Sequence, residues 1–255
     1  MEAKDWYKNW FSSPYYHQLY QHRDDTEANE FIIKLIGYLQ PENGSSMLDV
    51  ACGKGRHSKA LAEMGYDVTG IDLALPSIEE AKLSEHEKLH FYQHDMRLPF
   101  WINYFDFAFN FFTSFGYFKT KREHNNALRT IAQSIKENGV FVIDYLNVQF
   151  SENLEQNTKL IRVENTEFHI KKWHDNDYFF KQIQVLDESN HSLEDLYTER
   201  VAKFTLADFT EMLGLQNMEI TDVFGDYQLG NYNEEQSIRL IIVAKKKACK
   251  NQVEK

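Results

Sequence analysis

The chain has 255 residues, which is enough for one large domain or two small ones. It carries 28 Lys and Arg against 39 Asp and Glu, and this net charge of −11 is repelled by phosphate backbones and anionic membrane surfaces. We therefore expect no nucleic-acid partner and no membrane partner. Two lone cysteines far apart, the lack of an apolar leader and the lack of an apolar run long enough to span a bilayer make the cytoplasm the expected location.

The first forty residues (1–40) are predicted to form a helical N-terminal cover. Aromatic residues are frequent up to Tyr20, and apolar residues between Phe31 and Leu39 recur at helical spacing. A turn-like run that begins with Pro41 then separates this segment from the rest of the chain.

Short apolar runs alternate with helical stripes from residue 41 to 147. The predicted strands cover residues 47–51, 66–71, 89–93, 105–109 and 140–145. The predicted helices cover residues 57–64, 77–83 and 121–136, with the last one ending at Asn138-Gly139. This alternation predicts a parallel sheet with helices on both of its faces.

The pattern changes after Asn147, where extended segments replace the alternation. Turn-like residues at 175–177 and 188–190 divide these segments, so we expect an antiparallel β insertion or lid over residues 148–203.

The core pattern resumes near residue 204. Thr205 and Asp208 resemble a capping box that opens a short helix, and two strands are predicted at 218–224 and 238–244. We therefore predict a single domain over residues 1–255, whose core is made of residues 41–147 and 204–246.

The most informative stretch is DVACGKGRH, residues 49–57. A strand runs into a turn that contains Gly53 and Gly55, and a helix begins immediately afterwards. Glycine lets the backbone turn tightly and approach a ligand closely. Asp72 ends the next predicted strand about 20 residues later, where a carboxylate can bind both hydroxyls of a ribose. The pattern indicates a cofactor that contains adenosine.

Two residues distinguish between the cofactors of this kind. A pyrophosphate-binding turn reads G-x-G-x-x-G, but Ser58 occupies the third glycine position. Asp49 is also poorly placed beside a pyrophosphate, although it suits the ammonium and sulfonium of an amino-acid cofactor. An NAD-dependent oxidoreductase shares the strand, the turn and the acid, so it remains the alternative class of enzyme.

DVACGKGRHS, followed by GIDLA, resembles the first two signature motifs of class I S-adenosylmethionine-dependent methyltransferases. His94-Asp95-Met96 is similar to the third motif of this family, and residues 105–117 are similar to its fourth-strand segment. The resemblance implies an α/β fold with a doubly wound, Rossmann-like, seven-stranded sheet whose last strand is antiparallel. It also implies in-line transfer of a methyl group from S-adenosylmethionine to a nitrogen or oxygen of a small molecule. A protein that binds S-adenosylmethionine without catalysis would have the same motifs.

The resemblance implies a role for each of several residues. Asp49 would anchor the ammonium of the methionine part, and Asp72 would bind the ribose. The other residues expected to bind the cofactor are Tyr20, Arg23, Ala51, Gly53, Leu73, Asp95, Met96, Asn110 and Phe111. Tyr20 and Arg23 resemble the N-terminal cover of some amino-sugar and peptide N-methyltransferases, where such residues reach the carboxylate of the cofactor.

Two other patterns invite a catalytic interpretation, and we do not adopt it for either of them. Residues 86–90 read H-E-K-L-H and match a zinc motif, but that motif needs a continuous helix and a third ligand. Here it precedes a predicted strand, so we expect a charged surface loop and no metal. Cys52 lies within the first motif, where a small buried residue is expected rather than a nucleophile.

No strong general base is required, because the sulfonium already activates the methyl group of the cofactor. Tyr117, Tyr145 and Asn147 are the candidates expected near the pocket, although none is assigned a catalytic role. The insertion, including Trp173 and Tyr178, is expected either to cover the substrate or to form an oligomer contact such as a homodimer interface.

Overall fold

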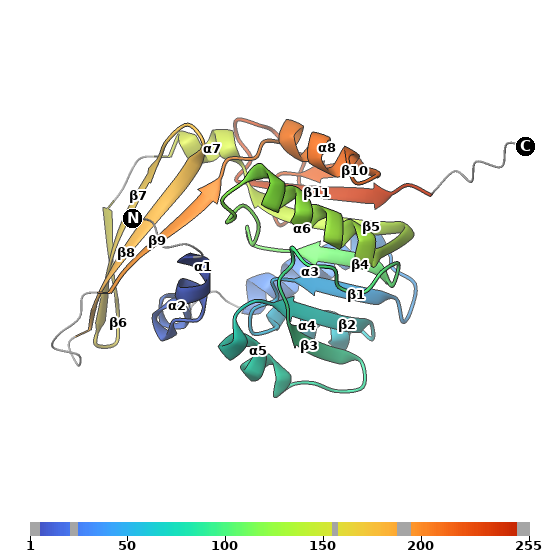
Figure 1. The fold of residues 1–255 in the computed structure, drawn as a ribbon, viewed down its shortest axis with the longest axis horizontal. Coiled ribbons are helices and arrows are strands. Elements are labelled where there is room, and N and C mark those ends of the chain that lie inside the picture. Colours follow the sequence, from blue (N-terminus) through green and yellow to red (C-terminus); the bar gives the residue numbers. More distant parts are fainter. Residues whose placement is uncertain (1–5, 21–24, 155–157, 188–194, 249–255) are drawn as a thin grey trace, which may run out of the picture.

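The computed structural model describes residues 6–20, 25–154, 158–187 and 195–248. Its main sheet has seven strands in the order β10-β11-β5-β4-β1-β2-β3 (Figure 1). These strands are β1 (Ser46–Val50), β2 (Asp67–Asp72), β3 (Leu89–Gln93), β4 (Phe105–Asn110), β5 (Ile135–Leu146), β10 (Met218–Phe224) and β11 (Arg239–Lys246). Strands β1 to β5 are parallel to one another, whereas β11 is antiparallel to both of its neighbours. The predicted fold class is confirmed, including the antiparallel last strand.

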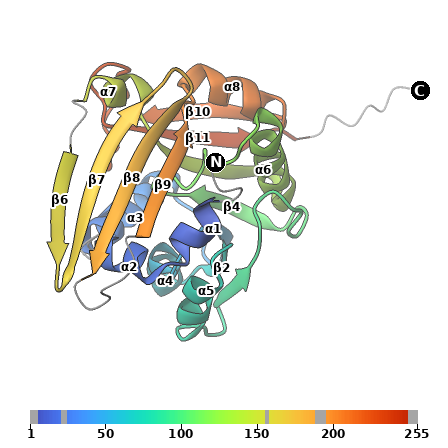
Figure 2. The same cartoon turned by 60° about the vertical axis from the view of Figure 1, so that its left-hand side comes forward.

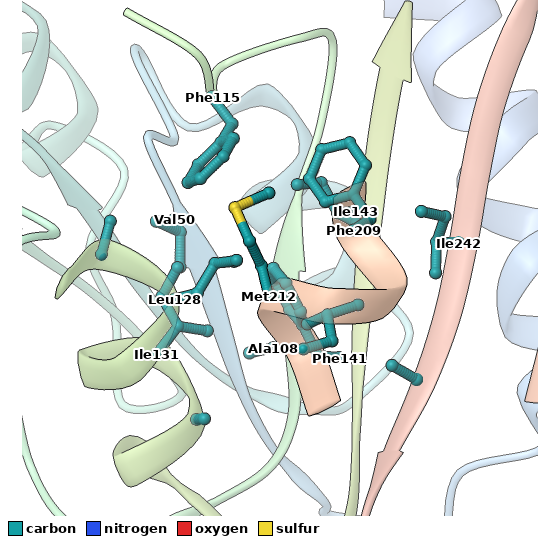
Figure 3. Packing of buried hydrophobic residues seen from close by; sticks show 14 of the residues in the cluster. Val50, Ala108, Phe115, Leu128, Ile131, Phe141, Ile143, Phe209, Met212 and Ile242 are labelled. Atoms are coloured by element: carbon teal, nitrogen blue, oxygen red, sulfur yellow. The ribbon is translucent and has the colours of Figure 1, made fainter. Parts of the chain in front are cut away.

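Successive residues of the central strands are buried against opposite layers of helices. Val142 packs with the helices on one face, and its neighbour Ile143 packs with those on the other. The first layer contains α3 (Asp25–Leu39), α4 (Arg56–Glu63) and α5 (Leu75–Lys82). The second layer contains α6 (Lys121–Ser134) and α8 (Leu206–Gly214), as Figure 3 shows for Leu128 and Met212. A sheet buried on both faces explains why its strands read as continuous apolar runs.

The insertion forms a separate antiparallel sheet in the order β6-β7-β8-β9. Its strands are β6 (Thr158–Val163), β7 (Thr166–His174), β8 (Tyr178–Asp187) and β9 (Asp195–Ala202), preceded by α7 (Val148–Glu152). Helices α1 (Trp6–Phe11) and α2 (Pro14–Tyr20) lie between this sheet and the main domain (Figures 1 and 2). Trp10 and Leu19 of these helices pack against Phe168 and Ile183 of the insertion. The N-terminal segment therefore fixes one face of the insertion to the domain.

The structure corrects the predicted end of α6. The helix ends at Ser134, and Ile135 already pairs with Phe105, whereas the sequence predicted a helix that continues to the Asn138-Gly139 turn. Asn138 has a φ of 63°, and a side chain on Gly139 would lie 2.5 Å from Ile135 Cγ2. The Asn-Gly pair is therefore an irregularity inside β5 and not the stop signal of the helix.

Two capping boxes begin the helices of the second layer. The box of Thr205 and Asp208 that was predicted at the start of α8 is confirmed, with the Asp208 amide donating to Thr205 Oγ1 over 3.3 Å. Thr120 and Glu123 form a second one at the start of α6, which the sequence analysis missed. Among the described residues, no helix is both long and apolar enough to cross a bilayer.

Candidate cofactor and active site

A cavity of about 960 Å³ opens at the carboxyl ends of the parallel strands. Its walls come from the segments that follow β1, β2, β3 and β4, from α1 and α2, and from the inner face of the insertion. In an open α/β sheet this edge is where ligands bind. The cavity is large enough for a cofactor and a second small molecule together.

The turn between β1 and α4 forms one end of the cavity. Ala51, Gly53 and Gly55 have φ values of 61°, 57° and 79°, so the backbone is left-handed at three of five consecutive positions. No heavy atom lies within 4 Å of the place that a Cβ of Gly53 would occupy. A ligand can therefore approach the Gly53 backbone as closely as the sequence predicted.

Asp72 ties this turn to the end of β2. Its carboxylate accepts hydrogen bonds from the backbone N–H of Gly53 at 2.8 Å and from that of Ala74 at 2.8 Å. Burial raises the pKa of Asp72, although the backbone hydrogen bonds oppose the shift. Asp72 and Leu73 both line the cavity. A carboxylate held in this way presents its remaining lone pairs to a ligand, which suits the two hydroxyls of a ribose.

Asp95 and Met96 line the cavity after β3. Arg97 donates hydrogen bonds to the Asp95 carboxylate through Nε and Nη2, at distances from 2.6 to 3.1 Å. Its Nη1 donates to Glu123 Oε1 at 2.8 Å. Burial by itself raises the pKa of Asp95, but the bonds from Arg97 outweigh it and the net shift is downward. Arg97 therefore holds Asp95 ionised and fixed. Arg97 was not predicted from the sequence, although a basic residue two positions after Asp95 was a signal for it.

Asn110 and Phe111 end β4. Phe111 lines the cavity, whereas Asn110 is fully buried behind the wall. The side-chain amide of Asn110 donates to the Val50 carbonyl at 3.0 Å, and its Oδ1 has no partner among the described residues. His57 packs on Phe111 with ring centroids 4.7 Å apart, and its Nε2 is also buried without a partner in the described chain. Burial, reinforced by nearby Arg56, lowers the pKa of His57 well below its usual range. His57 also lines the cavity, where its neutral imidazole does not repel a cationic ligand.

Tyr20 lines the cavity from α2, while Arg23 lies outside the described residues. The Tyr20 hydroxyl donates to Glu199 Oε1 at 3.1 Å and lies against Lys181 Nζ. Tyr20 therefore joins the N-terminal segment to the insertion, and its contact with a cofactor carboxylate stays a prediction.

Asp49 lies beneath the turn rather than in the cavity wall. It is 1 % exposed, and the Ser58 hydroxyl donates to its Oδ2 at 2.6 Å. Burial raises the pKa of Asp49 to about 6, even though the Ser58 bond opposes the shift. Any contact of Asp49 with an ammonium group would have to pass through an intervening water or backbone group.

We expect the stability difference between Asp49→Asn and the wild type to depend on pH. The native pKa of about 6 exceeds the usual 3.8, so the native state binds this proton more tightly than the unfolded state does. The wild type therefore loses stability as the pH rises from about 4 to about 6, and the loss amounts to about 3 kcal/mol at neutral pH. Urea unfolding from pH 4.5 to 7.5 measures it. Parallel stability curves for the two proteins would contradict the assignment.

One of the three residues expected near the pocket is part of the cavity wall. Tyr117 lines it and donates its hydroxyl to the Thr113 carbonyl at 2.6 Å. Tyr145 and Asn147 are not part of the cavity wall, although Leu146 between them is. The Tyr145 hydroxyl donates to the buried Ala202 carbonyl, and Asn147 donates to the Ser237 carbonyl at 2.7 Å.

The insertion contributes other residues than those expected. Trp173 stacks on Phe180 at 5.2 Å, and Tyr178 packs against the main core, so neither lines the cavity. The insertion residues that do line it are Lys159, Ile161, Ile170, Lys172, Lys181, Glu199 and Val201. This set was not predictable from the sequence, because inward and outward positions on a strand cannot be distinguished before the face that packs on the domain is known.

Neither the H-E-K-L-H pattern nor Cys52 has the geometry that its catalytic interpretation needs. His86 lies in an isolated bridge and His90 lies in β3, so these residues do not share a helix. No group of three or more metal-ligating side chains occurs in the described ranges. Cys52 is buried, and burial raises the pKa of its thiol, so it has no thiolate character.

The sheet order, the glycine turn and the acids after β2 and β3 define a class of protein. Residues 48–143 match the family described as "Methyltransferase domain". Over this part the chain is similar to class I S-adenosylmethionine-dependent methyltransferases. The similarity agrees with the predicted transferase and its S-adenosylmethionine cofactor rather than with the oxidoreductase alternative.

Individual proteins resemble this chain over different lengths. YqeM of Bacillus subtilis (strain 168), assigned to the methyltransferases, is 36% identical over 107 residues, which are 41% of this chain and 43% of that protein. The Streptomyces venezuelae dTDP-3-amino-3,4,6-trideoxy-alpha-D-glucopyranose N,N-dimethyltransferase is 34% identical over 119 residues, which are 46% and 48% of the two chains. The matched part thus spans less than half of these curated relatives.

The solved structures extend the likeness of the fold to most of the chain. An S-adenosylmethionine-dependent methyltransferase from Clostridium acetobutylicum ATCC 824 superposes with a TM-score of 0.75 at 18% identity, covering 94% of this chain and 99% of that one. At this identity the superposition establishes the fold, which includes the region of the insertion.

Proposed function

We propose that this protein transfers a methyl group from S-adenosylmethionine to a nitrogen or oxygen of a small molecule. The observation that carries the proposal is one continuous cavity, about 960 Å³ in volume, that joins the glycine turn to the inner face of the insertion. Relatives named as an amino-sugar N,N-dimethyltransferase and a glycine N-methyltransferase support a small acceptor.

The proposed cofactor residues act by binding and orientation. Asp72 would bind the ribose hydroxyls, Met96 would pack on the adenine, and the open backbone at Gly53 would lie against the methionine part. Asp95, Leu73 and Phe111 would complete this end of the cavity, with Asn110 and Asp49 supporting it from behind. The bound cofactor supplies a methyl group that its sulfonium activates. The protein then needs to align the acceptor in line and exclude water, so no strong base is required.

The insertion is proposed as the cover of the acceptor. Its inner face forms one wall of the cavity, and α1 and α2 hold it against the domain. The cavity is thus enclosed by parts of the chain that a minimal Rossmann-like domain lacks.

Calorimetric titration with S-adenosylmethionine, S-adenosylhomocysteine and NAD tests the cofactor. We expect tight binding of both sulfur nucleotides and no binding of NAD. Incubation of methyl-labelled cofactor with separate panels of small amines and hydroxy compounds then tests the transfer. Label in an amine or hydroxyl product supports the proposal. Binding without transfer to any member of either panel would favour a non-catalytic protein.

A further inference from the structure

A row of charged side chains crosses the inner face of the insertion sheet. Every second side chain of a strand points to the same face of the sheet. In β7 the buried Phe168 and Ile170 define the inner face, so Lys172 belongs to it, and in β8 the buried Ile183 places Lys181 on it in the same way. Lys159 of β6 lines the cavity beside them. The inner face is thus apolar over α1 and α2 and cationic where it meets the cavity.

The sheet register brings these lysines together. Lys172 lies directly opposite Lys181, and Lys181 lies directly opposite Glu199. Lys159 pairs with Ile170, which places it diagonally from Lys172. Like charges directly opposite each other destabilise an antiparallel pair, so folding gains nothing from this row.

Within the described chain, the row contains one carboxylate for three cations. Glu199 Oε1 lies 3.7 Å from Lys181 Nζ and also accepts hydrogen bonds from Trp10 Nε1 at 2.7 Å and from the Tyr20 hydroxyl. No carboxylate of the described residues pairs with Lys159 or Lys172. The charge of these two lysines is therefore not neutralised by the described part of the protein.

The cavity as a whole has the opposite charge balance to the chain. The described residues of its wall include seven lysines and arginines but three carboxylates, whereas the chain has 28 cations and 39 acids. Two of the three carboxylates, Asp72 and Asp95, lie at the proposed adenosine end. Three of the seven cations, Lys159, Lys172 and Lys181, lie on the insertion with the third carboxylate, Glu199. Two of the other four, Lys54 and Arg239, pair with acids outside the wall.

We infer that the acceptor carries an oxyanion, either a carboxylate or a phosphate, and that Lys159, Lys172 and Lys181 bind it. This inference rests on the proposed function, since it assigns the insertion end of the cavity to the acceptor. Lysine ammonium groups form charge-assisted hydrogen bonds with both kinds of oxyanion. The anion would relieve the repulsion between Lys172 and Lys181, and it would hold the nucleophile of the acceptor toward the glycine turn.

Anion binding to the full chain tests the inference. Pyrophosphate and citrate are titrated separately into the protein, with and without saturating S-adenosylhomocysteine. We expect Lys159→Ala/Lys172→Ala to weaken the binding of at least one anion about tenfold or more, because two charge-assisted contacts are lost. The preferred anion tells phosphate from carboxylate. Lys171→Ala is the matched control, because Lys171 is the neighbour of Lys172 on the opposite face of β7, and it should bind both anions as the wild type does.

The outcomes separate the inference from the proposed function. Equal anion binding by the wild type and the double variant would overturn the inference, as would equal losses in the double variant and in Lys171→Ala. A loss of affinity for S-adenosylhomocysteine in the double variant would assign the lysines to the cofactor and overturn it as well. Failure of the wild type to bind S-adenosylhomocysteine would instead contradict the proposed function, and the titration without that nucleotide would still measure the anion site.

Discussion

Replacement of Asp72 by alanine is expected to weaken the binding of S-adenosylmethionine roughly 100-fold or more. Hydrogen bonds to a charged group contribute about 1.5–3 kcal/mol each, and a carboxylate at this position would accept two from the ribose. The same side chain also fixes the Gly53 and Ala74 amides, so the turn that faces the methionine part loses its anchor. Calorimetric titration of the variant measures the loss.

A variant on the same strand separates this effect from general damage. Asp67 begins β2 at its opposite end and lies outside the cavity wall, so Asp67→Ala should retain the affinity of the wild type. Circular dichroism shows whether Asp72→Ala is folded. A folded Asp72→Ala protein with wild-type affinity would remove Asp72 from the proposed cofactor site.

The main sheet was predictable because its signals are local. Buried parallel strands read as apolar runs, and the capping box at Thr205 marks the start of α8 by residue type alone. The end of α6 was not predictable in this way. Asn138-Gly139 has the composition of a turn, but the pairing of Ile135 with Phe105 decides where the strand begins, and that contact is not local.

The proposed site likewise contains residues that the sequence could predict and residues that it could not. Asp72, Asp95 and Gly53 lie at the ends of strands or in a turn, and such positions face the ligand edge of any sheet of this order. Tyr145 sits at the end of a strand as well, yet the segment around Ala202 covers it. The inward-facing lysines of the insertion could not be predicted from the sequence, for a different reason. Lys171 and Lys172 are adjacent and chemically identical, and only the packing of Ile170 determines which of them faces the cavity.

The loop after β4 depends on a buried ion pair. Arg239 Nε and Nη2 lie 2.7 Å and 2.6 Å from Asp144 Oδ1, and the Asp144 side chain is fully buried. Asp144 also accepts from the Phe112 amide through its side chain at 2.8 Å and from the Thr113 amide through its carbonyl at 2.9 Å. Phe112 and Thr113 have φ values of 57° and 58°, a strained conformation for side chains of this kind. Since both residues line the cavity, the ion pair supports the wall as well as the core.

Arg239→Met is therefore expected to be the most destabilising of the substitutions considered. Methionine keeps much of the apolar stem but leaves the Asp144 carboxylate buried without its cation, which costs about 3–5 kcal/mol. The bond from Arg239 Nη2 to Thr113 Oγ1, 3.0 Å long, is lost as well. Urea unfolding at pH 7 measures the change, and the released loop should also weaken cofactor binding.

Two further variants decide whether the missing charge is the cause. Asp144→Asn/Arg239→Met removes both charges, so it should recover most of the lost stability, because a buried pair as a whole contributes little. Lys136→Met breaks the exposed pair with Asp106, whose atoms are 2.8 Å apart, and should cost at most about 1 kcal/mol. If the double variant were as unstable as Arg239→Met, the loss would come from packing around the guanidinium instead. Recovery of stability without recovery of cofactor affinity would show that the binding-competent loop needs the contacts of the pair itself, from Arg239 to Thr113 or from the Phe112 amide to Asp144.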